Sequence, residues 1–345
     1  MLVSILNLRT HATTPYCTLI PWVTIAPMSL IWQEYWAQIG SAQVVFAADD
    51  ITKTITPGMF LHVQKSDTLM FIMRVQVHET AVQVFAQDIK TLLLKKSMRK
   101  LETSGTVNVK NKILSVMANE GALLFLDQNT MTMYNAPSEN IDALEYSNVY
   151  DFVQNCLTLS KGGFMLRYIF STGLVQFEAT QGRDLRSTII FSPVLGNIAN
   201  AVLVRDNTAD YNKLTVLGED SSNNEVVVVV EREGLTEYDE IYRAVLDVKS
   251  ELRQTKETLS EYKSALRARG RKELAKLKTK TMVTGVSVGA SGAIPGDIVT
   301  VHNGGRGGAS TQAIRVVGKS IAYENGIDKV TLIFDQDAED VEPET

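Results

Sequence analysis

Glycines and hydroxyl residues cluster late in the chain in a pattern that could bind phosphate. The stretch GDIVTVHNGGRGGAST runs from Gly296 to Thr311, and four glycines surround Arg306 within Gly304–Gly308. Backbone N–H groups of such a loop bind phosphate when the loop follows a strand and precedes a helix. Here a β-rich segment follows, and the loop contains neither GK[ST] nor GxGxxG. The pattern therefore favours a turn between two strands, where glycine adopts positive φ without steric cost.

Other residues that could do chemistry are scattered. The histidines show neither HxH nor HExxH spacing; they are His11, His62, His78 and His302. We expect core or surface histidines, because a metal site or a triad requires such groups to converge. Two carboxylates facing one cleft could hydrolyse a glycosidic bond. The candidates near predicted strand ends are Glu178, Asp184, Glu231 and Glu233. We expect turn and strand-edge roles for them, which are commoner than catalysis.

Residues 263–280, KSALRARGRKELAKLKTK, form a basic segment that could contact nucleic acid. No aromatic residue interleaves with the charges after Tyr262, and the preceding part of the same predicted helix is acidic. We therefore expect a solvated helix face, with nucleic-acid binding as the alternative.

Length and composition indicate an ordinary globular protein of two or three domains. The chain has 345 residues, 45% hydrophobic content and a net charge of −5, so its average surface should repel DNA. Cys17 and Cys156 are isolated, which predicts buried thiols and neither a disulfide framework nor a zinc site. The apolar stretch Cys17–Trp32 is interrupted by prolines, so we expect neither a membrane span nor a signal peptide.

The elements that must position these residues are mainly strands. Short β runs fill residues 23–84, with a turn near Glu79-Thr80, and a helical period follows over Gln87–Leu101. Several short strands closed by a helix predict a small barrel or a strongly curled sheet. From Glu102 to about Ser192 the pattern is α/β, with a helix over Ser147–Ser160 and a hairpin around residues 171–173.

A second β series follows and is interrupted by a predicted long helix over Thr236–Lys278. Its apolar positions show a 4-3 spacing, typical of a seam between subunits or of packing along its own domain; they are Ile241, Val245, Val248, Leu252, Leu259, Tyr262 and Leu266. The five valines of Val226–Val230 predict a strand buried on both faces, or on one face with an intersubunit contact on the other. Six acidic residues in the last eleven predict a solvated tail.

Several runs together resemble siphophage tail-tip hub proteins. The opening, SLIWQEYWAQIGSAQVVFA followed by PGMFLHV, is similar to the start of that family's first barrel, and VFAQDIKTLLLKKSM to its closing. The middle signature lies in FEATQGRDLRSTIIFSPVLGNIANAVLVRD, with Gly182-Arg183-Asp184, Phe191-Ser192 and Gly196-Asn197. PGDIVTV, with Gly296-Asp297 at its entrance, resembles a late barrel strand.

The resemblance implies an α+β, mainly β fold with two tube-type β-barrel domains. Three subunits would form a pseudo-hexameric ring that continues the tail tube. The expected layout is a first barrel (1–101), an α/β middle domain (102–195), a second barrel (196–235 and 279–336), a helical insertion (236–278) and an acidic tail (337–345).

The resemblance also implies a non-enzymatic, structural role without a cofactor. The homotrimer would lie at the tip of the phage tail in the virion, after synthesis in the host bacterial cytoplasm. Its expected partners are a distal tail protein ring, the C-terminus of the tape-measure protein and tip or receptor-binding proteins. DNA would pass through the lumen without specific binding, which suits an acidic chain. The alternatives are a tail-associated peptidoglycan hydrolase and a nucleic-acid-binding protein that uses residues 263–280.

Overall fold

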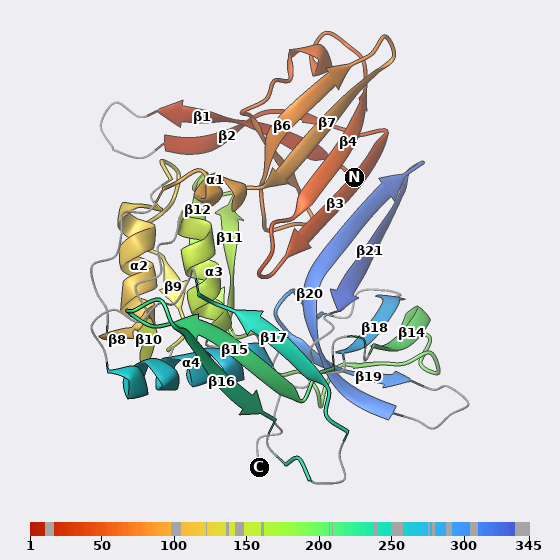
Figure 1. Cartoon of the computed structure of the whole chain (residues 1–345). Helices are drawn as coiled ribbons and strands as arrows, with labels where there is room; N and C mark the ends of the chain where they lie inside the picture. The colour runs from red at the N-terminus through yellow and green to blue at the C-terminus, as the bar shows by residue number, and fades with distance from the viewer. Residues whose placement is uncertain are drawn as a thin grey trace. The chain divides into compact units, whose positions relative to one another are not determined.

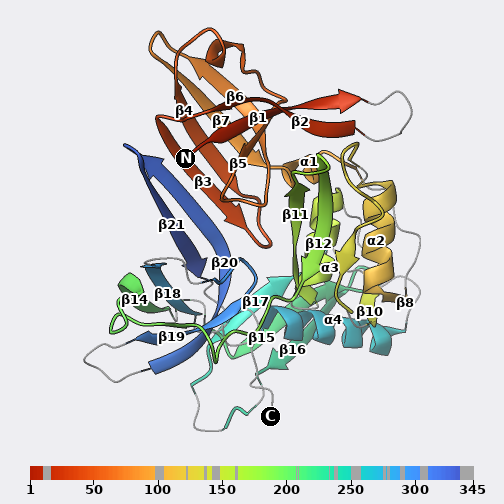
Figure 2. The same ribbon diagram turned by 180° about the vertical axis from the view of Figure 1, so that it is seen from behind.

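The structure is a computed structural model of the chain (Figures 1 and 2). It describes residues 1–10, 17–97, 105–121, 123–135, 138–141, 148–159, 162–206, 208, 210–232, 234–236, 240–249, 258–274, 277, 280–287, 292–303 and 310–334. The chain divides into two compact units. Unit 1 comprises Met1–Ala201 and Thr284–Thr345, and unit 2 comprises Val202–Val283.

The main sheet of unit 1 has eleven strands and combines both ends of the chain. The N-terminal strands are β1 (Val3–Thr10), β2 (Cys17–Ile25), β3 (Ser29–Tyr35), β4 (Ser41–Ala47), β5 (Phe60–Val63), β6 (Met70–Val77) and β7 (Ala81–Asp88). The later strands are β13 (Ile190–Phe191), β19 (Ile298–Asn303), β20 (Ser310–Glu324) and β21 (Ile327–Phe334). The strand order is β13-β19-β20-β3-β4-β7-β6-β5-β1-β2, with β21 also paired to β20.

Strand β20 connects the two sets of strands. Its first part pairs with β19, from Ser310 opposite Asn303 to Arg315 opposite Ile298. After a bulge between Val316 and Gly318, its second part lies between β21 and β3. Alternation of buried and exposed residues in β3, β4 and β7 forms one core, with Trp32, Val44, Phe46 and Val84 inaccessible to solvent.

A buried ion pair anchors the end of this strand series. Asp88 and Lys90 are both inaccessible to solvent, and the Lys90 Nζ lies 3.5 Å from Asp88 Oδ2. The same Nζ donates 2.6 Å hydrogen bonds to the carbonyls of Tyr35 and Gln38. Burial raises the pKa of Asp88 and lowers the pKa of Lys90, and the charge of each residue opposes the shift of the other.

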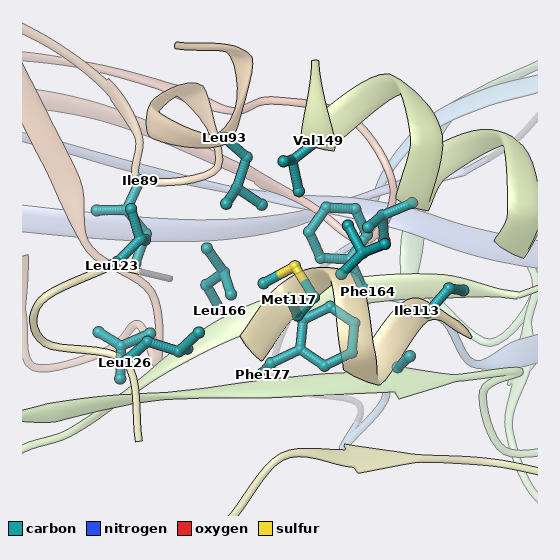
Figure 3. Packing of buried hydrophobic residues seen from close by; sticks show 14 of the residues in the cluster. Ile89, Leu93, Ile113, Met117, Leu123, Leu126, Val149, Phe164, Leu166 and Phe177 are labelled. Carbon is teal, nitrogen blue, oxygen red and sulfur yellow. The ribbon is translucent and has the colours of Figure 1, made fainter. Parts of the chain in front are cut away.

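The middle region packs helices against a small sheet. Its helices are α1 (Thr91–Leu94), α2 (Val109–Asn119) and α3 (Val149–Leu159). A separate 3-10 turn, Thr52–Thr54, lies between β4 and β5 in the chain. Strands β11 (Gly163–Ile169), β12 (Leu174–Thr180) and β9 (Thr132–Met133) form one sheet, and β8 (Gly105–Asn108) pairs with β10 (Ser138–Ile141). Figure 3 shows their shared core, in which Met117 lies beside the rings of Phe164 and Phe177.

Unit 2 is a three-stranded sheet with one helix on it. The strand order is β16 (Glu225–Glu231), β15 (Lys213–Glu219), β17 (Arg243–Asp247), and helix α4 (Leu259–Leu274) packs against β15 and β16. Tyr262 and Leu266 of α4 approach so closely that a Cβ on Gly218 would lie 2.3 Å from the Tyr262 hydroxyl. Strands β14 (Ile198–Asp206) and β18 (Lys280–Ser287), where the chain passes between the units, pair with each other.

Several predicted elements are confirmed. Strands β6 and β7 enclose the turn at residues 79–80, β11 and β12 form the hairpin around residues 171–173, and α3 occupies the predicted helix of residues 147–160. The mainly β character is also confirmed. Both cysteines are buried, as expected.

Two predicted helices are corrected. Within the described part of the range Gln87–Leu101, the helix is the four-residue α1. Gln87 and Asp88 belong instead to β7, where Gln87 is opposite Ser41 of β4 and Asp88 is opposite Met70 of β6. The long helix over Thr236–Lys278 is also wrong. Arg243–Asp247 form strand β17, which is parallel to β15, and α4 begins only at Leu259. The 4-3 spacing crosses two different elements, since Ile241 and Val245 are exposed while Tyr262 and Leu266 are buried.

The sequence assigns residues 213–219 and 225–231 to the second barrel. In the structure these residues form β15 and β16, which lie with β17 in the sheet of unit 2. The valine strand is buried on one face only: Val228 is 4% exposed against α4, and Val229 is 45% exposed. Of the two alternatives for this strand, burial on both faces within the chain is therefore wrong. The acidic tail, residues 337–345, lies outside the described residues.

Val228→Lys is expected to unfold unit 2, because it places an unpaired charge under α4 at a cost above about 4 kcal/mol. Val229→Lys, at the next position on the open face, should change stability by about 0.5 kcal/mol or less. Hydrogen exchange of peptides from β15 and β16 measures both. Equal protection in the two variants would contradict the assignment of faces.

Lys90→Met is expected to destabilise unit 1 by about 3–5 kcal/mol, because it leaves the Asp88 carboxylate buried without its cation. Two backbone carbonyls lose their donor as well. Lys53→Met, which changes an exposed lysine of the same unit, is the control and should have almost no effect. Urea unfolding followed by circular dichroism compares the two; equal midpoints would show that the pair does not stabilise the fold.

Candidate functional site at the Arg183 junction

An arginine–carboxylate clasp joins the loop after β12 to the turn before β19. Asp297 is 1% exposed, and its Oδ1 accepts hydrogen bonds from Arg183 Nε at 3.0 Å and from the Arg183 backbone N–H at 3.1 Å. Its Oδ2 accepts from Arg183 Nη2 at 2.6 Å and from the Ile294 backbone N–H at 2.9 Å. Two parallel side-chain bonds of this kind fix orientation as well as charge.

Glycines allow the two backbones to touch at this point. Gly182 has a φ of +80°, and a Cβ there would lie 1.8 Å from the carbonyl oxygen of Gly296. Next to it, Ile298 donates to the carbonyl of Arg183 at 2.9 Å, and Leu185 donates to the carbonyl of Ile298 at 2.8 Å. The loop therefore continues as a short parallel pair with β19.

Arg315 of β20 extends the clasp to the N-terminal strands. It donates to the carbonyls of Gln181 and Gly296 at 2.6 and 2.8 Å. Its guanidinium also lies over the ring of Trp36, 4.5 Å from the centroid, in cation–π geometry. We call the set Trp36, Gln181, Gly182, Arg183, Gly296, Asp297 and Arg315 the Arg183 junction. It connects the first strands, the middle region and the last strands of unit 1.

A small cavity of about 100 Å³ lies beside the junction. Its wall includes Glu178 and Asp297, but each carboxylate already binds an arginine: Glu178 lies 2.5 Å from Arg167 Nε, and Asp297 binds Arg183. Ligand pockets usually measure about 300–1,000 Å³. The paired carboxylates beside this cavity are suited to holding the loop after β12 and the turn before β19 in place.

The other signature residues build a rigid loop that exposes apolar side chains. Asn197 accepts from the backbone N–H of Ser192 at 2.8 Å and donates to the carbonyl of Ile190 at 2.7 Å. Phe191 is buried edge-on against Phe334. Between Ser192 and Asn197, Val194 and Leu195 are 84% and 63% exposed.

The glycine loop Gly304–Gly308 lies outside the described residues, but its flanking strands are described. Strands β19 and β20 are antiparallel neighbours on either side of it. A strand therefore follows the loop, as the turn interpretation predicted, and the helix that a phosphate loop requires does not. Asp297, predicted as a turn residue opening a strand, occupies that position and also forms the clasp.

The histidines lie in separate places. His62 Nε2 lies 3.0 Å from the Ser66 carbonyl oxygen, and burial lowers its pKa. His78 is exposed after β6, His302 is in β19, and His11 lies outside the described residues. Among the described residues, no three histidine, cysteine or acidic side chains converge as a metal site would require.

The candidate carboxylates each bind a different cation. Glu178 pairs with Arg167, Asp184 with Arg186 and Glu231 with Lys213, while Glu233 lies outside the described residues. In the basic segment 263–280, Arg267 and Arg271 are exposed on α4, and Arg269 lies 3.6 Å from Glu273. No helix within the described ranges is long and apolar enough to cross a bilayer.

Sequence reasoning singled out Arg183 and Asp297 in separate motifs but missed their contact. It also missed the roles of Trp36 and Arg315. No local pattern marks these residues as partners, because the pairing depends on how β3 and β20 come together. The buried pair of Asp88 and Lys90 was also missed, because both residues lie within the helix predicted over Gln87–Leu101.

The family model for siphovirus ReqiPepy6 Gp37-like proteins matches residues 106–337. The chain belongs to this family. The match covers more than half of the chain and includes the Arg183 junction except for Trp36. No curated protein sequence matches the chain. The resemblance to siphophage tail proteins inferred from the sequence is confirmed at this level.

Solved structures show the same fold along almost the whole length. A tail protein from Neisseria meningitidis is similar at a TM-score of 0.61 and 11% identity, covering 97% of each chain. A 43 kDa tail protein of prophage MuSo2 from Shewanella oneidensis has a TM-score of 0.61 at 7% identity, covering 97% of this chain and 98% of the other. An Escherichia coli type VI secretion component, described as similar to T4 phage tail proteins, has a TM-score of 0.53 at 11% identity over 97% of this chain and 77% of its own. At these identities the likeness establishes a tail-protein fold.

Arg183→Ala is expected to lower stability by about 1.5–3 kcal/mol, because the buried Asp297 keeps only its backbone donors. Arg186→Ala is the matched control, since its carboxylate Asp184 is 48% exposed against 1% for Asp297, and the pair should be worth less than about 1 kcal/mol. Thermal unfolding compares the variants. A smaller effect for Arg183→Ala than for Arg186→Ala would contradict the importance of the clasp.

Proposed function

We propose that the chain is a non-enzymatic structural hub at the distal tip of a phage tail. The observation that carries this proposal is the tail-protein fold over nearly the whole length, within a siphovirus family. In this role three copies form a ring that continues the tail tube and surrounds the channel for the tape-measure protein and DNA. The virion is then its site of action, after synthesis in the host cytoplasm.

The proposed layout has two tube-type β-barrel domains per subunit, which gives six similar barrels in the trimeric ring. Residues 1–101 form the first barrel, and residues 102–195 form the α/β middle domain. Strands β14 and β18–β21, which follow residue 195, form the second barrel. Unit 2 is then an insertion in the second barrel, larger than the sequence predicted. The acidic balance of the chain suits a channel that must release DNA.

The surface supports an assembly role. Val194 and Leu195 project from a loop whose ends are held by hydrogen bonds, so a partner meets a preformed apolar tip. The proposed partners are a distal tail protein ring, the C-terminus of the tape-measure protein and tip or receptor-binding proteins. The peptidoglycan hydrolase and the nucleic-acid binder remain outcomes of the tests below.

Light scattering of the purified chain is expected to give three times the 38.1 kDa mass of one copy. A chain that does not form trimers alone should form them once its neighbours in the tail are present. Electron microscopy of tails with this subunit labelled should show a ring at the distal tip. A strictly monomeric chain in the presence of its neighbours would contradict the hub. Lysis on a cell-wall zymogram would favour the hydrolase, and a salt-dependent shift of DNA on a gel would favour nucleic-acid binding.

A further inference from the structure

Among the residues that the structure describes, the sheet of unit 2 has one open face and two edges without a strand partner. Figures 1 and 2 view it from opposite sides and show α4 on only one face of β15, β16 and β17. Strands β16 and β17 each pair with β15, and neither has a second strand partner within the described part of the chain. The two edges of the sheet are therefore available for strand addition.

The open face is apolar at its centre. Val227 and Val229 of β16 are 49% and 45% exposed, and Val245 of β17 is 64% exposed. Val229 and Val245 are both opposite Thr215 of β15, so they lie in one row across the sheet. A long edge strand of valines beside an apolar face aggregates unless something covers it. The edge of β16 is therefore a candidate for pairing with another strand.

Charged residues at the ends of the strands indicate which partner fits. Glu231 pairs with Lys213 and Glu225 pairs with Lys249. Arg243, at the start of β17, is exposed and has no ion-pair partner among the described residues. The β16 edge therefore carries an acid at each end, and the β17 edge carries a base at its start and another just beyond its end.

A second β16 is a poor partner for β16. Antiparallel pairing centred on Val228 would place Glu225 of one copy opposite Glu231 of the other, and like charges directly opposite one another destabilise a sheet. Strand β17 of a second copy fits better. An antiparallel pair with Arg243 opposite Glu231 also places Lys249 opposite Glu225 and Val245 opposite Val229. A shift by one residue removes both charge pairs and separates the valines.

We propose that unit 2 is a contact between copies of this chain, in which the β17 edge of one copy pairs antiparallel with the β16 edge of the next. The strand directions are compatible with this pairing. Within one copy β17 is parallel and β16 antiparallel to β15, so β17 of one copy is antiparallel to β16 of a neighbour that has the same orientation. Each copy uses a different edge for each neighbour, so the contact is head-to-tail and can close a ring. It places the exposed valines Val229 and Val245 of two copies side by side on one face. The ring of three rests on the proposed hub function.

A cysteine pair tests the register. In the full-length Val229→Cys/Val245→Cys variant, oxidation should link copies into dimers and trimers on a non-reducing gel, because directly opposite residues have Cα atoms about 4.5–5.5 Å apart. Within one copy β15 separates these positions by two strand spacings, about 9.5 Å, beyond disulfide reach. The native thiols give little background, since Cys17 and Cys156 are buried and burial raises the pKa of Cys156 to about 12.

The two single variants are the controls and should stay unlinked. Covalent links in either single variant equal to those in the double variant would overturn the head-to-tail pairing. If light scattering shows a trimer but the double variant does not cross-link, the edge pairing is wrong and the hub stands. If the chain is monomeric at every concentration and with its tail neighbours, both are wrong.

A lysine variant gives a readout without cysteines. Val245→Lys lies on the open face, so it should fold like the parent, with unchanged hydrogen exchange in β15, and lose assembly at least tenfold in concentration. Ser222→Lys, in the exposed turn before β16 and away from the valine row, is the control and should assemble normally. Normal assembly of Val245→Lys would overturn the proposal.

Discussion

A buried carboxylate must be neutralised and hydrogen-bonded, and at Asp297 this requirement shapes the whole of unit 1. Its partners come from the loop after β12 and from its own turn, while Arg315 and Trp36 extend the contact to β20 and β3. Removing a charge from water costs several kcal/mol per ion unless such partners are present. The loop after β12 therefore meets the turn before β19 in one arrangement, because loss of the Arg183 contact would leave the Asp297 charge unpaired.

The same requirement operates at the end of the N-terminal strands. Lys90 neutralises Asp88 and also donates hydrogen bonds to the carbonyls of Tyr35 and Gln38. Nearby, the buried Glu34 accepts a hydrogen bond from Thr68 and lies 2.9 Å from Lys319 of β20. These pairs contribute orientation more than net stability, since apolar residues could fill the same space. The Glu34–Lys319 pair connects two residues that are opposite one another in β3 and β20, and so supports the register in which the last strands join the first.

Unit 2 follows a different logic. Its valines alternate between a face packed under α4 and a face left open, so half of the apolar surface of β16 is buried within the chain. Charged residues lie at the ends of β16 and β17, where they discourage indiscriminate strand pairing. In the proposed contact between copies, the same charges also specify one register for the partner strand.

The sequence by itself determined the local elements. β-branched and aromatic content marked β6 and β7, turn residues marked the β11–β12 hairpin, and a helical apolar face marked α3, because these signals reflect neighbours close in the chain. It also marked the short motifs around Arg183 and Asp297 and the strand character on both sides of the glycine loop. Tertiary structure decided which strands share a sheet, that residues 243–247 form a strand in place of a helix, and that Arg183 binds Asp297. Those outcomes depend on contacts between distant segments and on burial, which a local pattern does not contain.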